Sequence, residues 1–197
     1  TILAETVDMI PGGKGANQAY AAGSLGAETV MFGAVGADRY AEIERKSLQS
    51  AGVDISHLLV RTDCATGLAW ITVNDAGDNS IVVVPGANKT LSEKDIADND
   101  DLLHNCDIIL CQLEIPIQTV LYAARRAKEL GKTFILDPAP APKVFPSELY
   151  AYIDIIKPNE TELSLLTGKD VLDYENASDM LRTKGVKNVI VTLGEKG

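Results

Sequence analysis

Residues 107–136 read DIILCQLEIPIQTVLYAARRAKELGKTFIL, and this stretch decides the fold. It opens with a short apolar run, 107–113, typical of a buried strand. Apolar residues then recur at helical spacing with charged residues between them, and Gly131 ends the pattern. A second apolar run, 133–136, follows. The order of strand, amphipathic helix and strand predicts the βαβ unit from which parallel sheets are built.

The same alternation extends in both directions along the chain. Before this stretch we expect a strand and a helix, and after it a further series of strands and helices. The expected strands are 28–35, 153–156 and 188–192, and the expected helices are 40–49, 147–152, 160–166 and 177–184. Repeated units of this kind predict an α/β fold with a mostly parallel sheet and helices on both of its faces.

One segment, 57–85, interrupts the alternation. Its two β-rich runs, 67–73 and 79–84, flank a loop with the composition of a hairpin turn, and 57–61 is a possible third strand. A small antiparallel sheet cannot bury both of its faces alone, so we expect it to cover a ligand, to pair with a second copy, or both. A packed β excursion without function is the alternative.

A glycine-rich turn, 11–17, leads into a helix-like run. Its glycines let the backbone adopt conformations that are closed to other residues, and they let a ligand approach the main chain. These glycines are Gly12, Gly13 and Gly15.

The turn differs from both common phosphate-binding loops. A Walker A loop needs Ser or Thr after its lysine, whereas Gly15 follows Lys14, and a dinucleotide fingerprint needs glycine where Gln18 stands. What remains is the cation of Lys14 and the carboxamide of Asn17, beside backbone N–H groups at a helix start. Because each sugar hydroxyl both donates and accepts a hydrogen bond, this set suits a polyhydroxyl ligand. A glycine-rich helix entry without a ligand stays the alternative.

Composition narrows the class of protein. The 197 residues, of which 46% are hydrophobic, are enough for one main domain with a small appendage. A formal charge of −10 argues against nucleic acid as a partner, and no apolar run approaches the length of a membrane span. The three cysteines, Cys64, Cys106 and Cys111, lack metal-ligand spacing, which predicts a reduced, cytoplasmic protein.

Polar or glycine-rich turns follow several of the expected strands. Glu114 follows the strand at 107–113, and Asp137 follows the strand at 133–136. The turns at 157–162 and 192–197 follow the last two expected strands. Because ligands of open α/β sheets bind beyond the carboxyl ends of the strands, these turns are expected to share one functional edge. Each also has a purely structural interpretation, such as a helix-capping pair formed by Asn159 and Glu162.

Six short motifs occur in order along the chain: GGKGANQA (12–19), GAN (86–88), QLE (112–114), PAPA (138–141), PNETE (158–162) and TLG (192–194). Their sequences and order resemble those of the PfkB, or ribokinase-like, family of carbohydrate kinases. The resemblance covers essentially the whole chain. It implies a Rossmann-like α/β fold with a small β-sheet lid.

The resemblance also implies roles for individual residues. The glycine turn and one acidic residue would bind the sugar: Gly12, Gly13, Lys14, Asn17 and Glu114. A second set would bind ATP: Asn159, Thr192, Gly194, Glu195, Lys196 and Gly197. Glu162 would act on Mg²⁺ through water.

The activity implied by the resemblance is ATP-dependent phosphorylation of a sugar, with D-ribose converted to ribose 5-phosphate at O5. Another member of the family, acting on deoxyribose, fructose or a nucleoside, is one alternative. A non-catalytic sugar-binding module is the other. The resemblance further implies a homodimer formed through the β lid.

Several parts of the family pattern are missing from these residues. The catalytic Asp, in a Gly-Ala-Gly-Asp turn, would lie beyond Gly197, as would the site for a monovalent cation such as K⁺. The opening strand of the family pattern is missing too, and the first strand of the lid is expected before residue 12. At 36–38 the family usually has Gly-Asp-Asp, which leaves the role of Asp38 open. We therefore expect 1–56 and 86–197 to form an incomplete kinase core that is inactive alone, with 57–85 as the lid or dimerisation insert.

Overall fold

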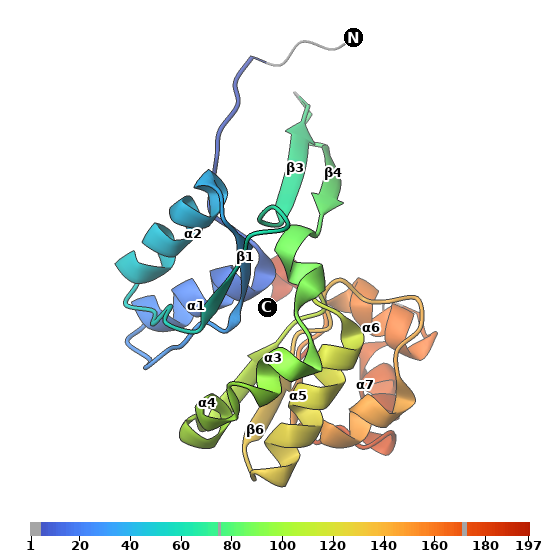
Figure 1. Cartoon of the computed structure of the whole chain (residues 1–197). Helices are drawn as coiled ribbons and strands as arrows, with labels where there is room; N and C mark the ends of the chain where they lie inside the picture. The colour runs from blue at the N-terminus through green and yellow to red at the C-terminus, as the bar shows by residue number, and fades with distance from the viewer. Residues whose placement is uncertain (1–4, 75, 171–172) are drawn as a thin grey trace. The chain divides into compact units, whose positions relative to one another are not determined.

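The computed structural model describes residues 5–74, 76–170 and 173–197. The chain divides into two compact units, residues 1–87 and residues 88–197 (Figure 1). Each unit has its own strands and its own buried residues, so each is described by itself.

The first unit contains a short parallel pair of strands. Strand β1 (Gly33–Gly36) pairs with β2 (Leu58–Arg61), with Gly33 opposite Leu58 and Gly36 opposite Arg61. Helix α1 (Lys14–Ser24) and helix α2 (Arg39–Ser50) pack against each other in the same unit. The predicted strand at 28–35 is shorter than expected, because before Gly33 only Val30 forms an isolated bridge, to Asp54.

A small apolar core holds these elements together. It is rich in alanine, which lets α1 and α2 approach closely. Its members are Ala16, Ala19, Val35, Ala41, Leu48, Ala51, Val53, Ile55 and Leu58.

A β-hairpin completes the first unit. Strands β3 (Leu68–Val73) and β4 (Asn79–Val84) are antiparallel, with Leu68 opposite Val84 and Val73 opposite Asn79. The predicted hairpin is therefore confirmed. The prediction of 57–61 as a possible third strand of this sheet is wrong, because β2 hydrogen-bonds in parallel to β1 instead.

The second unit is built on a four-stranded parallel sheet. Its strands lie in the order β5-β6-β7-β8, so each strand after β5 pairs with the one that precedes it along the chain. They are β5 (Ile108–Cys111), β6 (Thr133–Leu136), β7 (Ile155–Ile156) and β8 (Asn188–Val189). The sheet and its sequential βα units confirm the predicted α/β fold.

Helices connect these strands. Helix α5 packs against β6, α7 packs against β8, and α6 packs against α7 (Figure 1). Side chains with no exposed surface, among them Phe134, Leu136 and Ile156, form the core beneath them. The helices are α3 (Glu93–Ala97), α4 (Asp100–Asn105), α5 (Ile117–Glu129), α6 (Glu160–Thr167) and α7 (Tyr174–Thr183), with 3₁₀ turns η1 (Gly86–Thr90), η2 (Ser147–Tyr152) and η3 (Gly194–Lys196).

Strands β7 and β8 are shorter than the predicted 153–156 and 188–192. At the start of β7 the side chain of Asp154 takes part in the pairing, since its Oδ2 accepts the backbone N–H of Phe134 at 2.8 Å. After β8, Ile190 N still donates to Ile156 O at 2.9 Å, and Thr192 forms an isolated bridge to Asn159. Among the described residues, no helix is both long and apolar enough to cross a membrane.

Candidate functional site

The glycine turn forms the start of α1. Gly13 is the N-cap residue, with φ of 98° and ψ of 142°, a conformation that is essentially restricted to glycine. Because Gly13 has no side chain, no side chain caps the helix, and its first turn contains no acidic residue. The positive end of the helix dipole and its first N–H groups are thus directed at the surface beside Lys14.

Two other residues of this turn behave differently. The Asn17 side chain is exposed, while the Asn17 backbone N–H donates to Gly13 O at 2.9 Å and closes the first helical turn. Gly12 has no left-handed φ, and a Cβ built there meets nothing within 4 Å. The backbone therefore requires glycine at position 13 and not at position 12.

Glu44 of α2 contacts the glycine turn, and the sequence did not predict this contact. Its Oε2 accepts the backbone N–H of Gly12 at 3.0 Å. Burial raises the pKa of the Glu44 carboxyl, and the hydrogen bond from Gly12 counteracts only part of that rise. Nothing in the spacing of Glu44 distinguishes it from other acidic residues on an amphipathic helix, so no sequence signal predicted this contact.

The second unit presents the other predicted residues at one edge of its sheet. Glu114 follows β5, Asn159 follows β7, and Thr192 follows β8. Since all four strands are parallel, these positions lie beyond the same, carboxyl ends of the sheet. The prediction that these turns share an edge is confirmed within this unit.

An ion pair between Asp137 and Lys157 lies at this edge. Lys157 Nζ is 3.2 Å from Asp137 Oδ2, and the Asp137 side chain is only 8% exposed. A nearly buried carboxylate costs free energy unless it is paired, and Lys157 supplies the compensating charge. The sequence placed Asp137 and the turn at 157–162 at this edge, but it did not predict the ion pair between Asp137 and Lys157.

Asn159 and Glu162 form the capping box of α6. Asn159 Oδ1 accepts the backbone N–H of Glu162 at 2.8 Å, and Glu162 Oε2 accepts the backbone N–H of Asn159 at 2.9 Å. The structural interpretation of this pair is therefore correct. Asn159 also forms the bridge to Thr192, so the structure brings two of the residues expected to bind ATP side by side.

The turn after Thr192 is compact. Gly194 has φ of 60°, residues Gly194–Lys196 form a 3₁₀ turn, and Leu193 N donates to Gly197 O at 2.6 Å. Residues 194–197 are all exposed.

The carboxylates of the chain can be compared with the ligands that Mg²⁺ requires. Across the described ranges, no three or more His, Cys, Asp or Glu side chains gather to hold a metal ion. Mg²⁺ commonly keeps several waters and is held by one or two carboxylates together with substrate phosphates. One carboxylate that acts through water, as expected of Glu162, fits this coordination.

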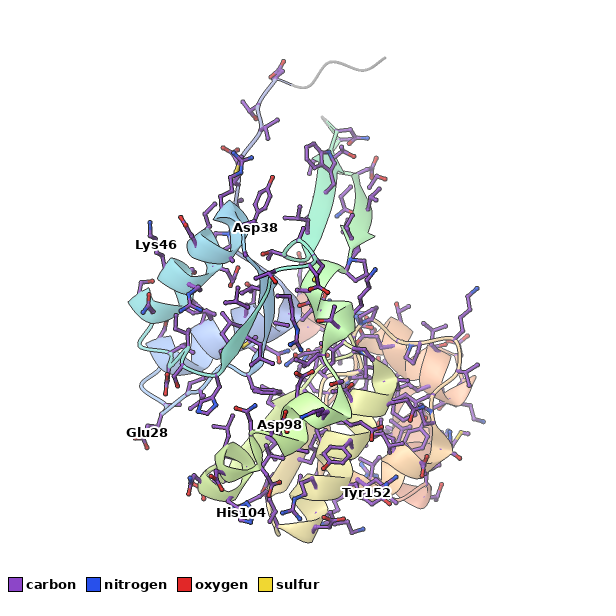
Figure 2. The ribbon with its side chains drawn as sticks, viewed as in Figure 1. Glu28, Asp38, Lys46, Asp98, His104 and Tyr152 are labelled. Carbon is purple, nitrogen blue, oxygen red and sulfur yellow. The ribbon has the colours of Figure 1, made fainter. Side chains whose placement is uncertain are left out.

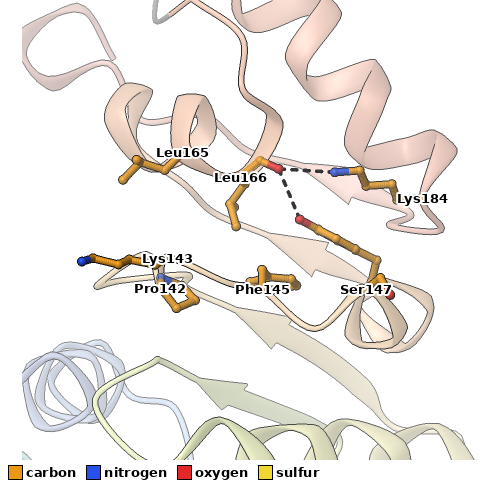
Figure 3. A pocket seen from close by; sticks show the side chains of 8 residues that line it. Pro142, Lys143, Phe145, Ser147, Leu165, Leu166 and Lys184 are labelled. Atoms are coloured by element: carbon orange, nitrogen blue, oxygen red, sulfur yellow. Dashed lines mark hydrogen bonds between the residues drawn. The ribbon is translucent and has the colours of Figure 1, made fainter.

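A pocket of about 470 Å³ lies elsewhere in the second unit (Figure 3). Two of its polar side chains have partners, because Lys184 Nζ donates to Leu166 O at 3.3 Å and lies 4.8 Å from the centre of the Tyr150 ring, and the Tyr150 hydroxyl donates to Leu166 O at 3.5 Å. Burial raises the pKa of the Tyr150 hydroxyl to about 12. None of the predicted site residues lines this pocket.

The predicted sugar-binding residues thus fall into two sets. Gly12, Gly13, Lys14 and Asn17 belong to the first unit, and Glu114 belongs to the second. All the predicted ATP-binding residues, together with Glu162, belong to the second unit.

Comparison with known proteins gives a consistent result. The whole chain, residues 1–197, matches the family described as pfkB family carbohydrate kinase. A ribokinase of Staphylococcus aureus (strain COL) is 40% identical over 189 residues, which are 94% of this chain and 62% of the relative. A deoxyribokinase of Salmonella typhi shows the same identity and the same shares.

A solved structure agrees with these relatives. The structure of Arabidopsis thaliana ribokinase complexed with ribose and ATP superimposes with a TM-score of 0.93 at 36% identity, covering 100% of this chain and 65% of that one. The chain therefore spans somewhat less than two thirds of the length of the proteins that it matches.

Proposed function

Since the chain belongs to the pfkB family of carbohydrate kinases, we propose that its protein phosphorylates D-ribose at O5, using ATP, and releases ribose 5-phosphate. The observation that carries this proposal is the start of α1. Its N-cap residue, Gly13, has no side chain to cap the helix, and Lys14 and Asn17 follow in the first helical turn. Such a corner offers backbone donors, a cation and a carboxamide, which together match a ring of hydroxyl groups. The similarity to ribokinases over 94% of the chain supports the same activity.

In this proposal the glycine turn holds the sugar. Lys14 and Asn17 hydrogen-bond to its hydroxyls, and the backbone at Gly12 and Gly13 allows the ring to approach the helix. Glu114, at the end of β5, accepts a further hydroxyl.

ATP binds at the carboxyl edge of the four-stranded sheet. Asn159 faces the phosphates, and Glu162 holds a water of the Mg²⁺ that accompanies them. Thr192, Gly194, Glu195, Lys196 and Gly197 form the nucleotide pocket.

The chemistry depends mainly on alignment and charge. Phosphoryl transfer needs the attacking hydroxyl in line with the phosphate and positive charge on the phosphate oxygens. Mg²⁺ supplies that charge when it is bound with ATP. The residues of this chain bind and orient the two substrates, and the catalytic base is not assigned to any of them.

The hairpin β3–β4 has two apolar faces, which suit two tasks. One face carries Trp70 and its cross-strand partner Val82, and the other carries Ile71 and its partner Ile81. These four side chains are between 50% and 63% exposed. We assign one face to covering the bound sugar and the other to a second copy of the chain, so the protein is a homodimer.

Deoxyribose is the second candidate substrate, because a deoxyribokinase is as similar to this chain as a ribokinase is. The two sugars differ by one hydroxyl. A site that hydrogen-bonds this hydroxyl rejects the sugar that lacks it.

The proposal is tested with the complete protein that contains this chain. Initial rates with Mg²⁺ and ATP are measured for ribose, 2-deoxyribose, fructose and adenosine, and the kcat/KM values are compared. Ribose is expected to give the highest value. A higher value for another acceptor would reassign the substrate, and no turnover with any of them would favour a non-catalytic sugar-binding module.

The homodimer has a separate test by light scattering after size exclusion. Trp70→Glu and Ile71→Glu place a charge on opposite faces of the hairpin. One of the two is expected to convert a dimer to a monomer. A monomeric parent protein, or two dimeric variants, would contradict the assignment.

A further inference from the structure

Asp38 receives more hydrogen bonds than a helix cap requires. As the N-cap residue of α2, labelled in Figure 2, it accepts the backbone N–H groups of Tyr40 at 3.1 Å and Ala41 at 3.0 Å through Oδ1. The same oxygen accepts the hydroxyl of Thr66 at 2.7 Å, and Oδ2 accepts the backbone N–H of Thr66 at 2.8 Å. Asp38 thus binds both the start of α2 and a residue 28 positions further along the chain.

Thr66 passes this connection on to β1. Its side chain is buried, and its Oγ1 accepts the backbone N–H of Gly36 at 2.9 Å while its own O–H donates to Asp38. Thr66 stands two residues before β3, at the entry of the hairpin. The hydroxyl therefore joins the end of β1, the start of α2 and the hairpin entry.

The exit of the hairpin meets the same segment. After β4, Ala87 N donates to Ala65 O at 2.8 Å. Gly86, with φ of 52°, approaches so closely that an added Cβ would lie 2.4 Å from Ala65 O. On β1, a Cβ on Gly36 would lie 2.5 Å from Thr66 N. Residues 65–67 are thus enclosed by glycines that no larger residue could replace without movement of the backbone.

Apart from the hydrogen bonds at its base, the hairpin makes few packing contacts within the first unit. Along β3 and β4 every residue is exposed except Leu68, which is half-buried. Because few of its side chains are packed, its orientation depends on the hydrogen bonds at its base.

We propose that Asp38 and Thr66 are positioning residues that fix the base of the β3–β4 hairpin, so that the hairpin closes over the pentose in one orientation. The inference rests on the proposed function in one respect, namely that the hairpin covers the sugar. Neither residue touches the substrate. Their effect on the reaction passes through the hairpin, as lid elements commonly act on substrate binding.

The decisive variants change one hydroxyl. Thr66→Val removes the hydroxyl and keeps the branched shape, and Thr66→Ser keeps the hydroxyl. Asp38→Asn keeps an acceptor for α2 and removes the acceptor for the Thr66 backbone N–H. Thr29→Val is the matched control in the same unit, because the Thr29 hydroxyl donates to Ala27 O, two residues away, at 3.1 Å.

Hydrogen exchange of the complete protein without ligand gives the first measurement. Peptides within 68–84 are expected to exchange about 10- to 100-fold faster in Thr66→Val and Asp38→Asn, the range for loss of a hydrogen bond to a charged group. Thr66→Ser and Thr29→Val are expected to match the parent, and peptides from the second unit are expected to stay unchanged in all variants. Parent-like exchange of 68–84 in both Thr66→Val and Asp38→Asn would overturn the inference whatever the enzyme does.

Steady-state kinetics give the second measurement. In Thr66→Val the KM for the pentose is expected to rise about tenfold, with the KM for ATP and kcat near the parent values, and Thr66→Ser is expected to restore the pentose KM. Faster exchange of 68–84 with an unchanged pentose KM would overturn the positioning role. A parent protein that phosphorylates no pentose would instead overturn the proposed function, and the exchange result would still decide whether the hairpin base is held by these residues.

Discussion

Asn159 and Glu162 hydrogen-bond to each other reciprocally, side chain to backbone in both directions, at 2.8 and 2.9 Å. The pair that is proposed to face the phosphates and the Mg²⁺ therefore also starts α6. A substitution at Glu162 can affect the stability of α6, the use of Mg²⁺ or both, and the two effects can be measured separately.

Glu162→Gln is expected to keep the fold and weaken the use of Mg²⁺. Glutamine serves in a capping box as glutamate does, so the free energy of unfolding should change by less than about 0.5 kcal/mol. Glu162→Ala loses the hydrogen bond and should destabilise the protein by about 0.5–1.5 kcal/mol. Urea unfolding measures stability, and the Mg²⁺ concentration for half-maximal rate measures metal use. An unchanged Mg²⁺ requirement in both variants would remove Glu162 from the metal site.

Asn17→Ala is expected to lower kcat/KM for ribose. The loss corresponds to about 2–4 kcal/mol of transition-state stabilisation, the scale for a polar site left without a partner. The KM for ATP should change little, because Asn17 belongs to the glycine turn. Ser24→Ala, at the other end of α1, is the matched control and should behave as the parent. A ribose kcat/KM in Asn17→Ala equal to that of the parent would exclude Asn17 from the site.

Gly13→Ala and Gly12→Ala are expected to differ sharply in stability. Alanine at position 13 must adopt φ of 98°, which should cost about 1–3 kcal/mol. Alanine at position 12 meets nothing within 4 Å, so the free energy of unfolding should stay within about 0.5 kcal/mol of the parent. Equal losses in the two variants, measured by urea unfolding, would show that strain at Gly13 is not the cause.

Asp38 is expected to make stability depend on pH in the acid range. Burial alone would raise the pKa of its carboxyl, but hydrogen bonds from Thr66, Ala41 and Tyr40 outweigh burial and hold the pKa below the ordinary 3.8. A lowered pKa contributes stability that is fully present above about pH 3.8 and is lost as the pH falls through the folded value. The stability difference between the parent and Asp38→Asn, from urea unfolding between pH 6 and pH 3, should therefore shrink with falling pH. A constant difference over this range would contradict the lowered pKa.

The sequence predicted those parts of the fold that depend on local patterns. The helix that ends before Gly131 and the strand at 133–136 follow from apolar spacing, and the hairpin follows from a turn flanked by β-branched residues. The partner of β2 did not follow, because Leu58–Arg61 has the composition of a strand but nothing in it specifies a parallel neighbour. The contact between Asp38 and Thr66 was missed for the same reason: it joins residues far apart in sequence, and each alone resembles an ordinary cap or turn.

Of the candidate site, the residues at strand ends were predictable because parallel strands place their carboxyl ends together. The contact between Glu44 and Gly12 and the ion pair between Asp137 and Lys157 were not predicted, since both depend on tertiary packing. The relation of the glycine turn to Glu114 stays a prediction.

The strand order of the second unit has a consequence for the synthesis of the protein. Because each of β6, β7 and β8 pairs with the strand made just before it, every new strand of this sheet finds its neighbour already synthesised as the chain emerges from the ribosome. This unit can grow layer by layer during translation, without waiting for distant parts of the polypeptide.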